Sequence, residues 1–357
     1  MNILLSTQTS MFIVVLLFAL GIILIVKGGD FFVDASSWIA EKSGIPKFII
    51  GATIVSIATT LPELLVSVIG AIDGKHLADA GDMAGAIGQV GMSVGNAIGS
   101  VTANTGLIMG ISLCFMPAVI KRKSYLLKSL MLIVATALIW LLSLNSELSV
   151  LDSVFLLIIL VCFITENIIS GKREQEVKKV LENDNNSKEE QDKTQPKIKT
   201  PVDKKDLVIN LLKFVFGAAG IVIGAQLLVD EGTLIAQKLG VSEAIIGLTM
   251  VAIGTSLPEL VTTITAIVKK ESSLSVGNII GANLIDICMI LPVCSFVYGG
   301  SFPIENRTIY LDMPVCLGFI LIALVPTLIR GKFSKVQGFI LVSLYLAYAI
   351  VISVVSF

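Results

Sequence analysis

The chain has 357 residues, of which 55% are hydrophobic and 15% charged, and its formal net charge is −1. A soluble domain carries about 25% charged residues, so this composition indicates a protein that lies in lipid. The near-zero net charge gives no reason to expect nucleic-acid binding, and the single histidine excludes any zinc site that needs two imidazoles.

Ten apolar runs follow one another along the chain, and each is long enough to cross a hydrocarbon core of roughly 30 Å as a helix. The predicted spans lie near residues 10–27, 47–72, 87–117, 125–144, 151–170, 207–229, 241–268, 274–298, 309–329 and 336–356. Several exceed the length of a simple span, which indicates breaks within them. The sequence therefore predicts an all-α polytopic protein of the cell (inner) membrane with ten transmembrane helices.

A hydrophilic segment at residues 171–206 follows the fifth predicted span. It has no apolar face and contains many charges of both signs, so we expect a disordered linker in solvent. The segment divides the chain into a first unit of five helices, residues 1–170, and a second unit of five helices, residues 207–357.

The two units are related in sequence. Residues 28–67 and 224–263 are identical at 18 of 40 positions when aligned without a gap, and the match includes T-x-L-P-E-L. A second block, V-G-N-A-I-G at 94–99, matches V-G-N-I-I-G at 276–281, after 14 additional residues in the first unit. Because each unit has an odd number of helices, the two copies should cross the membrane in opposite directions, as in many transporters built from inverted repeats.

Basic residues provide a separate test of this topology, because Lys and Arg collect in short loops on the cytoplasmic side. They cluster after the third, fifth and ninth predicted spans, at Lys121, Arg122, Lys123, Lys128, Lys172, Arg173, Arg330, Lys332 and Lys335. The loops near 145–149 and 299–308 contain few basic residues. This pattern predicts both termini outside the cell and the 171–206 linker in the cytoplasm.

Each unit contains a polar motif inside an apolar span. In the first unit, S-I-A-T-T-L-P-E places four residues on one helix face, namely Ser56, Thr59, Thr60 and Glu63. In the second unit, A-I-G-T-S-L-P-E places at the same positions Ala252, Thr255, Ser256 and Glu259. A carboxylate at the centre of a membrane helix costs about 2.5 to 3.5 kcal/mol, so two glutamates at matched positions indicate a function.

The proline that precedes each glutamate supports this interpretation. Pro62 and Pro258 remove an amide donor and free the carbonyls of Ala58 and Gly254, four residues earlier. Free backbone carbonyls at membrane depth are tolerated where they line a cavity or bind an ion.

A second polar element follows in each unit. G-S-V-T-A-N places Ser100 and Asn104 four residues apart, and G-A-N-L-I-D places Ala282 and Asp286 at the equivalent positions. Together the two units supply carboxylates, an amide, hydroxyls and carbonyls without a nearby imidazole or thiolate. These oxygen ligands suit Ca²⁺, which takes about 6 to 8 of them in a flexible geometry, whereas soft metals prefer Cys or His.

Charge counting suggests a transport mechanism. Glu63 and Glu259 balance one Ca²⁺, and the three acids that include Asp286 balance three Na⁺ if all are ionised. Carboxylates that face no ion are costly in the membrane, so the empty site should resist the conformational change. Such a site would couple the movement of one ion to the return of the other.

These motifs resemble the two alpha repeats of the cation/calcium exchanger superfamily, in its Na⁺/Ca²⁺ exchanger branch. The resemblance covers both units and implies an antiporter of ten helices with ion sites at mid-membrane. It implies that Ca²⁺ is bound by Glu63 and Glu259, with Thr59 and Thr255, and by the backbone carbonyls of Ser56 and Ala252. It further implies Na⁺ sites at Thr60, Ser256 and Ser100 and a middle position at Asn104 and Asp286.

Three residues depart from the pattern of that branch, namely Ala58, Val101 and Ala282. Ala282 matters most, because it replaces the serine of the second repeat and removes one hydroxyl from a Na⁺ site. The proton-coupled branch usually has G-N-A-x-E where this chain has T-S-L-P-E, which favours Na⁺ as the coupling ion. Coupling to H⁺ or K⁺, or transport of another divalent ion, remains an alternative.

The same residues allow other interpretations. Asp286 could be protonated and hydrogen bonded to Asn104, and Glu166 could extend to the interface. Asp73, Asp79 and Asp82 should face outside and could concentrate cations at the entrance, although solvated loop charges are the simpler interpretation. An intramembrane hydrolase would need two acids that converge on a water, and a channel would need a ring of filter groups around an axis. We therefore expect an antiporter and not an enzyme, with Ca²⁺, Na⁺ and lipid as its partners, no cofactor and no obligate protein partner.

Overall fold

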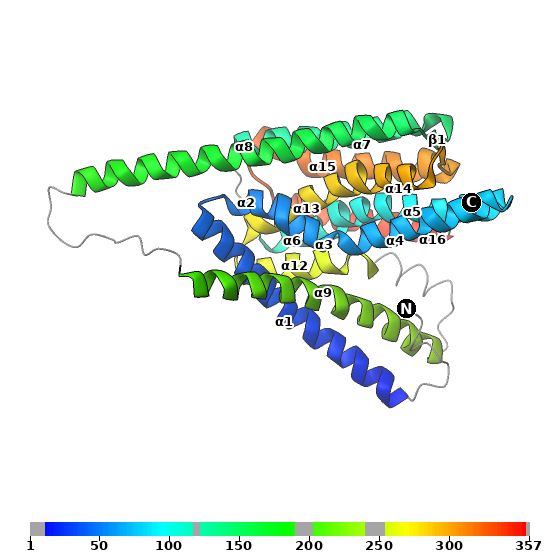
Figure 1. Cartoon of the computed structure of the whole chain (residues 1–357), viewed down its shortest axis with the longest axis horizontal. Coiled ribbons are helices and arrows are strands. Elements are labelled where there is room, and N and C mark those ends of the chain that lie inside the picture. The colour runs from blue at the N-terminus through cyan, green and yellow to red at the C-terminus, as the bar shows by residue number, and fades with distance from the viewer. Residues whose placement is uncertain (1–10, 117–121, 190–202, 240–253, 355–357) are drawn as a thin grey trace.

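The computed structural model describes residues 11–116, 122–189, 203–239 and 254–354, and within these ranges the chain is almost entirely helical. The first unit contains α1 (Met11–Ser43), α2 (Lys47–Ile50), α3 (Ser56–Thr59), α4 (Leu61–Asp79), α5 (Met83–Ala103), α6 (Met109–Phe115), α7 (Arg122–Leu142) and α8 (Val150–Glu189). The second contains α9 (Lys204–Lys238), α12 (Leu257–Val268), α13 (Ser272–Ile285), α14 (Leu291–Tyr298), α15 (Met313–Arg330) and α16 (Lys335–Val354). Figure 1 shows these helices running roughly side by side, with α1 and α9 together along one side of the bundle.

Several spans are assembled from consecutive helices joined by π-helical turns, in which the hydrogen bonds skip one more residue than in an α-helix. The turns are η1 (Gly51–Val55), η2 (Asn104–Ile108), η5 (Asp286–Ile290) and η6 (Thr308–Asp312). A short 3₁₀ segment, η3 (Ser143–Asn145), ends α7. The breaks expected from the length of the apolar runs are therefore present.

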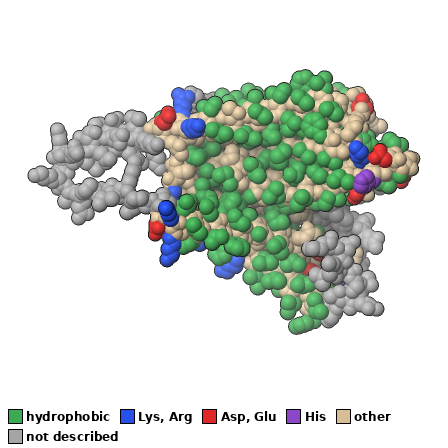
Figure 2. All heavy atoms as spheres, in the orientation of Figure 1, with side chains coloured by type: hydrophobic (Ala, Val, Ile, Leu, Met, Phe, Trp, Pro, Cys, Tyr) green, Lys and Arg blue, Asp and Glu red, His purple; other side chains and the backbone are tan. Residues whose placement is uncertain are grey.

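Eight helical spans within the described residues are long and apolar enough to cross a membrane, and the bent pair formed by 47–59 and 61–79 makes a ninth. The seventh predicted span, 241–268, lies partly outside the described residues. Its described part contains only the shorter helix α12. The count of ten helices stays a prediction. Figure 2 shows a broad apolar surface with charged side chains gathered at its two ends, as expected for a protein that spans a bilayer.

The segment expected to be a disordered linker is partly helical. α8 continues from the membrane span through Gly171 to Glu189, and α9 begins at Lys204. The expectation of disorder was therefore wrong for residues 171–189, because a helix that is already nucleated can extend through Lys, Glu and Gln at little cost. The rest of the segment up to residue 202 lies outside the described residues.

The 14 extra residues of the first unit lengthen two helices. α4 has 19 residues where α12 has 12, and α5 has 21 residues where α13 has 14. The insertion is thus about two additional turns on each arm of a helical hairpin. Asp82, expected to be a loop charge, caps α5 by accepting a hydrogen bond from the amide of Gly85 at 2.9 Å.

The two loops with few basic residues meet at one end of the molecule. Strand β1 (Glu147–Leu148) pairs antiparallel with β2 (Phe302–Pro303), so that Leu148 lies opposite Phe302. The amide of Ile304 also donates to the carbonyl of Ser146 at 2.9 Å. The predicted topology placed both loops on the same side, and the structure brings them into contact.

Helices α1 and α9 cross at close range through glycines. A side chain at Gly28 would meet the backbone of Gly217 at 2.9 Å, and one at Gly217 would meet the amide of Phe32 at 2.6 Å. Only glycine allows backbones to approach this closely, as in other membrane helix pairs with small residues at the interface. The pair therefore behaves as one packing unit.

A buried ion pair joins α7 to α8. Lys128 Nζ lies 3.0 Å from Glu166 Oε2, and the lysine side chain is fully buried while that of glutamate is 13% exposed. The same ammonium lies 5.3 Å from the centre of the Phe48 ring. Glu166 therefore does not extend to the interface as expected, and Lys128 is not a loop residue, because each charge neutralises the other inside the helix bundle.

Breaking this pair should destabilise the fold. We expect Glu166→Gln to lower the free energy of unfolding by roughly 3 to 5 kcal/mol, because it leaves the Lys128 charge buried without its carboxylate. Denaturant unfolding of the purified protein in detergent measures this loss. The double variant Lys128→Met/Glu166→Gln should recover most of it, and equal losses in the single and double variants would contradict the pairing.

Candidate functional site

A break in the second span places the first glutamate. Thr60 ends α3 with φ −87° and ψ 0°, and the segments before and after it meet at 45°. Helix α4 then begins at Leu61, with Pro62 and Glu63 in its first turn. In the second unit Ser256 has φ −85° and ψ 4°, and Glu259 lies in the first turn of α12 in the same way. The repeated sequence motif thus has the same local backbone in both units.

The second polar element of each unit also has matched geometry. Asn104 begins the π-helical turn η2, and Asp286 begins the π-helical turn η5. These turns lie in the two most deeply buried spans among the described residues, 83–115 and 272–298. Single π-helical turns occur often at functional sites, although the sequence analysis contained no signal for them.

Three carboxylates are buried between these helices. Glu63, Glu259 and Asp286 are each 0% exposed, and none of their oxygens has a hydrogen-bond partner of ordinary geometry within the described residues. Ionisation of one of these groups disfavours ionisation of its neighbours, because like charges repel at low dielectric constant. Buried charges are stable only when they are paired or coordinate a cation, so this arrangement suits a positive ion.

The three acids do not form a compact metal centre by themselves. Among the described residues, no three Asp, Glu, His or Cys side chains converge closely enough to hold one metal ion. A cation at this site would therefore need hydroxyl, amide or carbonyl oxygens as well. This requirement fits Ca²⁺ and Na⁺ better than Zn²⁺.

The hydroxyls of the first unit turn toward its own backbone. Thr59 donates to the carbonyl of Ser56 at 3.3 Å, and Thr60 donates to the same carbonyl. In the second unit Ser256 donates to Ser100 at 3.4 Å, so these two predicted residues meet across the units. Thr255 lines a cavity, and the predicted carbonyl of Ala252 lies outside the described residues.

The alternative interpretation of Asp286 is not supported. Neither of its oxygens, nor Oδ1 of Asn104, has a hydrogen-bond partner within the described part of the chain. A protonated Asp286 bonded to Asn104 would have satisfied both groups. The hydrogen bond between Asp286 and Asn104 is thus not formed, and the place of Asp286 in the ion site stays a prediction.

The sequence analysis missed two asparagines that contact the site. Asn96 donates to the carbonyl of Glu63 at 3.2 Å and to the hydroxyl of Ser67 at 2.9 Å. Asn278 accepts a hydrogen bond from Thr59 at 3.3 Å. Both asparagines occupy the third position of the repeated V-G-N-x-I-G block, and a polar residue repeated within an apolar span was the signal that could have identified them.

One face of the site is tightly covered. A side chain at Gly277 of α13 would meet the carbonyl of Phe48, and one at Gly281 would meet the carbonyl of Ala52 at 2.6 Å. In return, a side chain at Gly51 would meet the amide of Asn278 at 2.9 Å. Helix α13 therefore packs backbone against backbone on α2 and η1.

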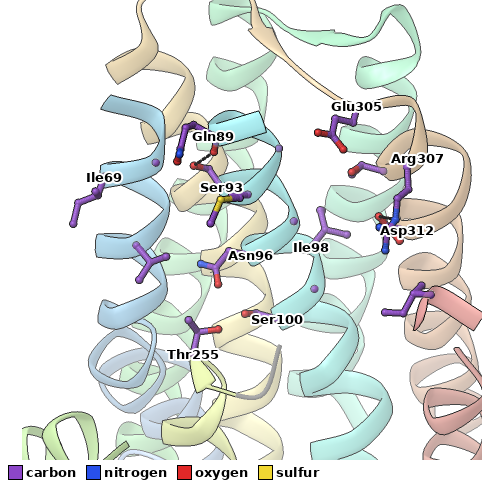
Figure 3. A pocket seen from close by; sticks show the side chains of 18 of the residues that line it. Ile69, Gln89, Ser93, Asn96, Ile98, Ser100, Thr255, Glu305, Arg307 and Asp312 are labelled. Carbon is purple, nitrogen blue, oxygen red and sulfur yellow. Dashed lines mark hydrogen bonds and ion pairs between the residues drawn. The ribbon is translucent and has the colours of Figure 1, made fainter. Parts of the chain in front are cut away.

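The equivalent face of the first unit is open. Gly95 and Gly99, the counterparts of the two α13 glycines, line a cavity of about 570 Å³ that also reaches Asn96, Ser100 and Thr255. Figure 3 shows Ser100 and Thr255 at one end of this cavity, with Asn96 beside them. Among the described residues, the α5 glycines thus border a cavity, whereas their α13 counterparts pack against backbone.

The far end of the cavity is charged. Figure 3 shows Glu305, Arg307 and Asp312 together there. Arg307 Nε lies 3.8 Å from Asp312 Oδ2, and Tyr348 donates to Asp312 Oδ1 at 2.7 Å. Asp73, expected to be a solvated loop charge, belongs to α4 and lines the same cavity. This end of the cavity, which we call its mouth, carries more acids than bases and should attract cations.

Comparison with known proteins gives matches over nearly the whole chain. Residues 13–168 and 209–354 match the sodium/calcium exchanger protein family. An uncharacterized membrane protein of Methanocaldococcus jannaschii is 31% identical over 92% of this chain and 94% of its own length. The sodium/calcium exchanger MaX1 of Methanosarcina acetivorans is 29% identical over 94% of this chain and 97% of its own.

A solved structure is similar over a comparable length. The sodium-calcium exchanger NCX_Mj, soaked with Na⁺ and Sr²⁺, superposes with a TM-score of 0.73 at 29% sequence identity. The match covers 95% of this chain and 98% of that structure. The fold described above is therefore the fold of that protein.

The buried carboxylates should make stability depend on cations. We expect Glu63→Gln and Glu259→Gln each to raise the melting temperature without divalent ions, because each substitution removes repulsion between buried charges. Ca²⁺ at about 100 times its dissociation constant should stabilise the unaltered protein by about 2.7 kcal/mol, and both variants should lose this gain.

Thermal unfolding in detergent with and without CaCl₂ measures both effects. The matched control is Glu147→Gln, which removes a carboxylate at β1, far from the site in sequence. An equal Ca²⁺ response in Glu63→Gln and Glu147→Gln would show that the stabilising ion binds elsewhere.

Proposed function

Because the chain belongs to the sodium/calcium exchanger protein family, we propose that it is a secondary active antiporter that exchanges Ca²⁺ for Na⁺ by alternating access. The observation that carries the proposal is the set of three buried carboxylates without hydrogen-bond partners among the described residues. Ser100 and Thr255, which belong to the same predicted site, line a cavity. The direction we propose is Ca²⁺ extrusion, driven by Na⁺ entering the cell.

In this proposal the two repeats share the ligands of one composite site. Ca²⁺ is held by the carboxylates of Glu63 and Glu259, the hydroxyls of Thr59 and Thr255, and the carbonyls of Ser56 and Ala252. Na⁺ occupies positions at Thr60, Ser256 and Ser100, and the middle position lies at Asn104 and Asp286. Thr59 and Thr60 must turn away from the Ser56 carbonyl before that oxygen can bind an ion, so ion binding exchanges internal hydrogen bonds for ligation.

We propose that the two five-helix units are inverted repeats in the cell (inner) membrane, ten helices in all, with both termini outside and the 171–206 segment in the cytoplasm. Two observations support this arrangement. The loops at β1 and β2 meet at one end, and in Figure 2 Lys and Arg gather mainly at the opposite end. The open cavity then faces outward, because Glu305 and Arg307 near β2 lie at its mouth.

The difference between the two faces supports alternating access. Gly277 and Gly281 are covered by α2 and η1, whereas Gly95 and Gly99 at the equivalent positions line the cavity. Two units of related sequence can exchange these conformations, which would close the outer face and open the inner one. The site would then be exposed to each side in turn.

Coupling to H⁺ or K⁺, or exchange of another divalent ion, is the alternative within the same class. Ala282 supports this alternative, since it is fully buried in α13 and supplies no hydroxyl at the position that Ser100 occupies in the first unit. One Na⁺ position would then have a ligand fewer than its counterpart.

Transport by purified protein in liposomes tests the main proposal. We expect ⁴⁵Ca²⁺ uptake that depends on an outward Na⁺ gradient and that Glu63→Gln reduces to background. Loss of one charged ligand should cost about 2 to 5 kcal/mol, or more than about thirtyfold in affinity. Uptake that is insensitive to the Na⁺ gradient but follows a K⁺ or H⁺ gradient would favour the alternative, and uptake linear in Ca²⁺ without saturation would indicate a channel.

Restoring the missing hydroxyl tests the coupling ion. We expect Ala282→Ser to lower the Na⁺ concentration for half-maximal exchange by about tenfold, because a hydroxyl that binds an ion contributes about 1.5 kcal/mol. The matched control is Ala97→Ser, which adds a hydroxyl at another fully buried alanine, on α5. An unchanged Na⁺ dependence in Ala282→Ser would remove this position from the Na⁺ site.

A further inference from the structure

Two asparagines at the same position of the two repeats make different contacts. Asn96 donates its amide to the carbonyl of Glu63 and to the hydroxyl of Ser67, both within its own unit. Asn278 instead uses its amide oxygen to accept from Thr59 in the other unit, and its buried Nδ2 has no hydrogen-bond partner within the described residues. Since both asparagines belong to the repeated V-G-N-x-I-G block, we attribute the difference to conformation.

The contacts of each asparagine correspond to the side of the site on which it lies. Asn96 borders the open cavity beside Thr255 (Figure 3), while Asn278 is fully buried under the covered face. By the alignment of the repeats, Glu259 and Thr263 stand to Asn278 as Glu63 and Ser67 stand to Asn96. A buried amide nitrogen without a hydrogen-bond acceptor costs free energy. A second conformation in which Asn278 Nδ2 finds an acceptor would explain why an asparagine is present at this position of α13.

We propose that Asn96 and Asn278 are positioning residues that exchange partners when the site turns from one side of the membrane to the other. When the outer face closes, Asn278 donates to the Glu259 carbonyl and the Thr263 hydroxyl, and Asn96 accepts from Thr255. The inference rests on the alternating access proposed above. In each conformation, the asparagine on the open side donates its amide to the backbone carbonyl of the glutamate in its own unit. The position of that glutamate, an expected ion ligand, therefore depends on which side is open.

The exchange uses the amide NH₂ donor and the amide oxygen acceptor of each asparagine in different conformations. Each residue uses its amide donor when its own face is open and its amide oxygen when that face is closed. Aspartate has nearly the same shape and keeps the acceptor but loses the donor. Asn96→Asp should therefore favour the inward-open conformation, and Asn278→Asp should favour the conformation described here.

A buried serine can report which face is open without any transport. Ser275 on α13 is 0% exposed and is the counterpart of Ser93, which lines the open cavity. The experiment places Ser275→Cys in the full-length chain with the five native cysteines replaced, and measures its rate of reaction with N-ethylmaleimide. The rate should rise about fivefold in Asn96→Asp and fall about fivefold in Asn278→Asp, the change expected from about one net hydrogen bond.

The control is Asn283→Asp, a third buried asparagine, whose amide donates to Thr105 at 2.8 Å and which has no asparagine counterpart, because Val101 occupies that place. It adds a similar carboxyl group and should leave the rate unchanged. Equal shifts in all three variants, or shifts of the same sign in Asn96→Asp and Asn278→Asp, would overturn the proposal.

A further substitution decides the matter if an aspartate variant does not fold. Ser67→Ala removes a present acceptor of Asn96 and should raise the labelling rate. An unchanged or lower rate in Ser67→Ala would also overturn the proposal. The labelling remains informative even if the liposome assay finds no Na⁺-dependent Ca²⁺ uptake, so the two proposals can fail separately.

Discussion

The constraint on which this structure depends is the burial of three carboxyl groups in a largely apolar protein. Glu63, Glu259 and Asp286 lack hydrogen-bond partners within the described residues, and an ionised carboxyl group without a partner is costly to bury. The surrounding backbone is organised around it. Breaks at Thr60 and Ser256 place the two glutamates, and a π-helical turn begins at the aspartate.

A site of this kind has to be reached by ions without being left open on both sides. The structure meets this condition with glycines, which allow α13 to seal one face through backbone contact while the same positions of α5 line a cavity. Because the glycines of both helices belong to repeated sequence, the alternating access that we propose needs only one kind of contact, formed by each repeat in turn.

The sequence was sufficient to predict the parts of the protein that depend on local pattern. Apolar run length identified most of the spans, and the duplicated T-x-L-P-E-L motif located both buried glutamates. Contacts between distant helices could not be predicted in this way. The pairing of Lys128 with Glu166 and that of Asn278 with Thr59 depend on how helices pack, and charge alone suggested a surface position for the first two. The helical continuation of α8 was missed because its composition suggested disorder.

The longer arms of the α4–α5 hairpin have a consequence for the surroundings of the cavity mouth. Seven further residues on each arm add about 10 Å along a helix, and Figure 1 shows this hairpin extending past its neighbours at one end of the bundle. The screening length at physiological ionic strength is about 8 Å. The tip of the hairpin therefore stands more than one screening length beyond the point that a hairpin with the shorter arms of the second repeat would reach. The ion concentration at this elevated rim is governed by the protein's own acids, so capture of ions there should vary little with the headgroup composition of the membrane.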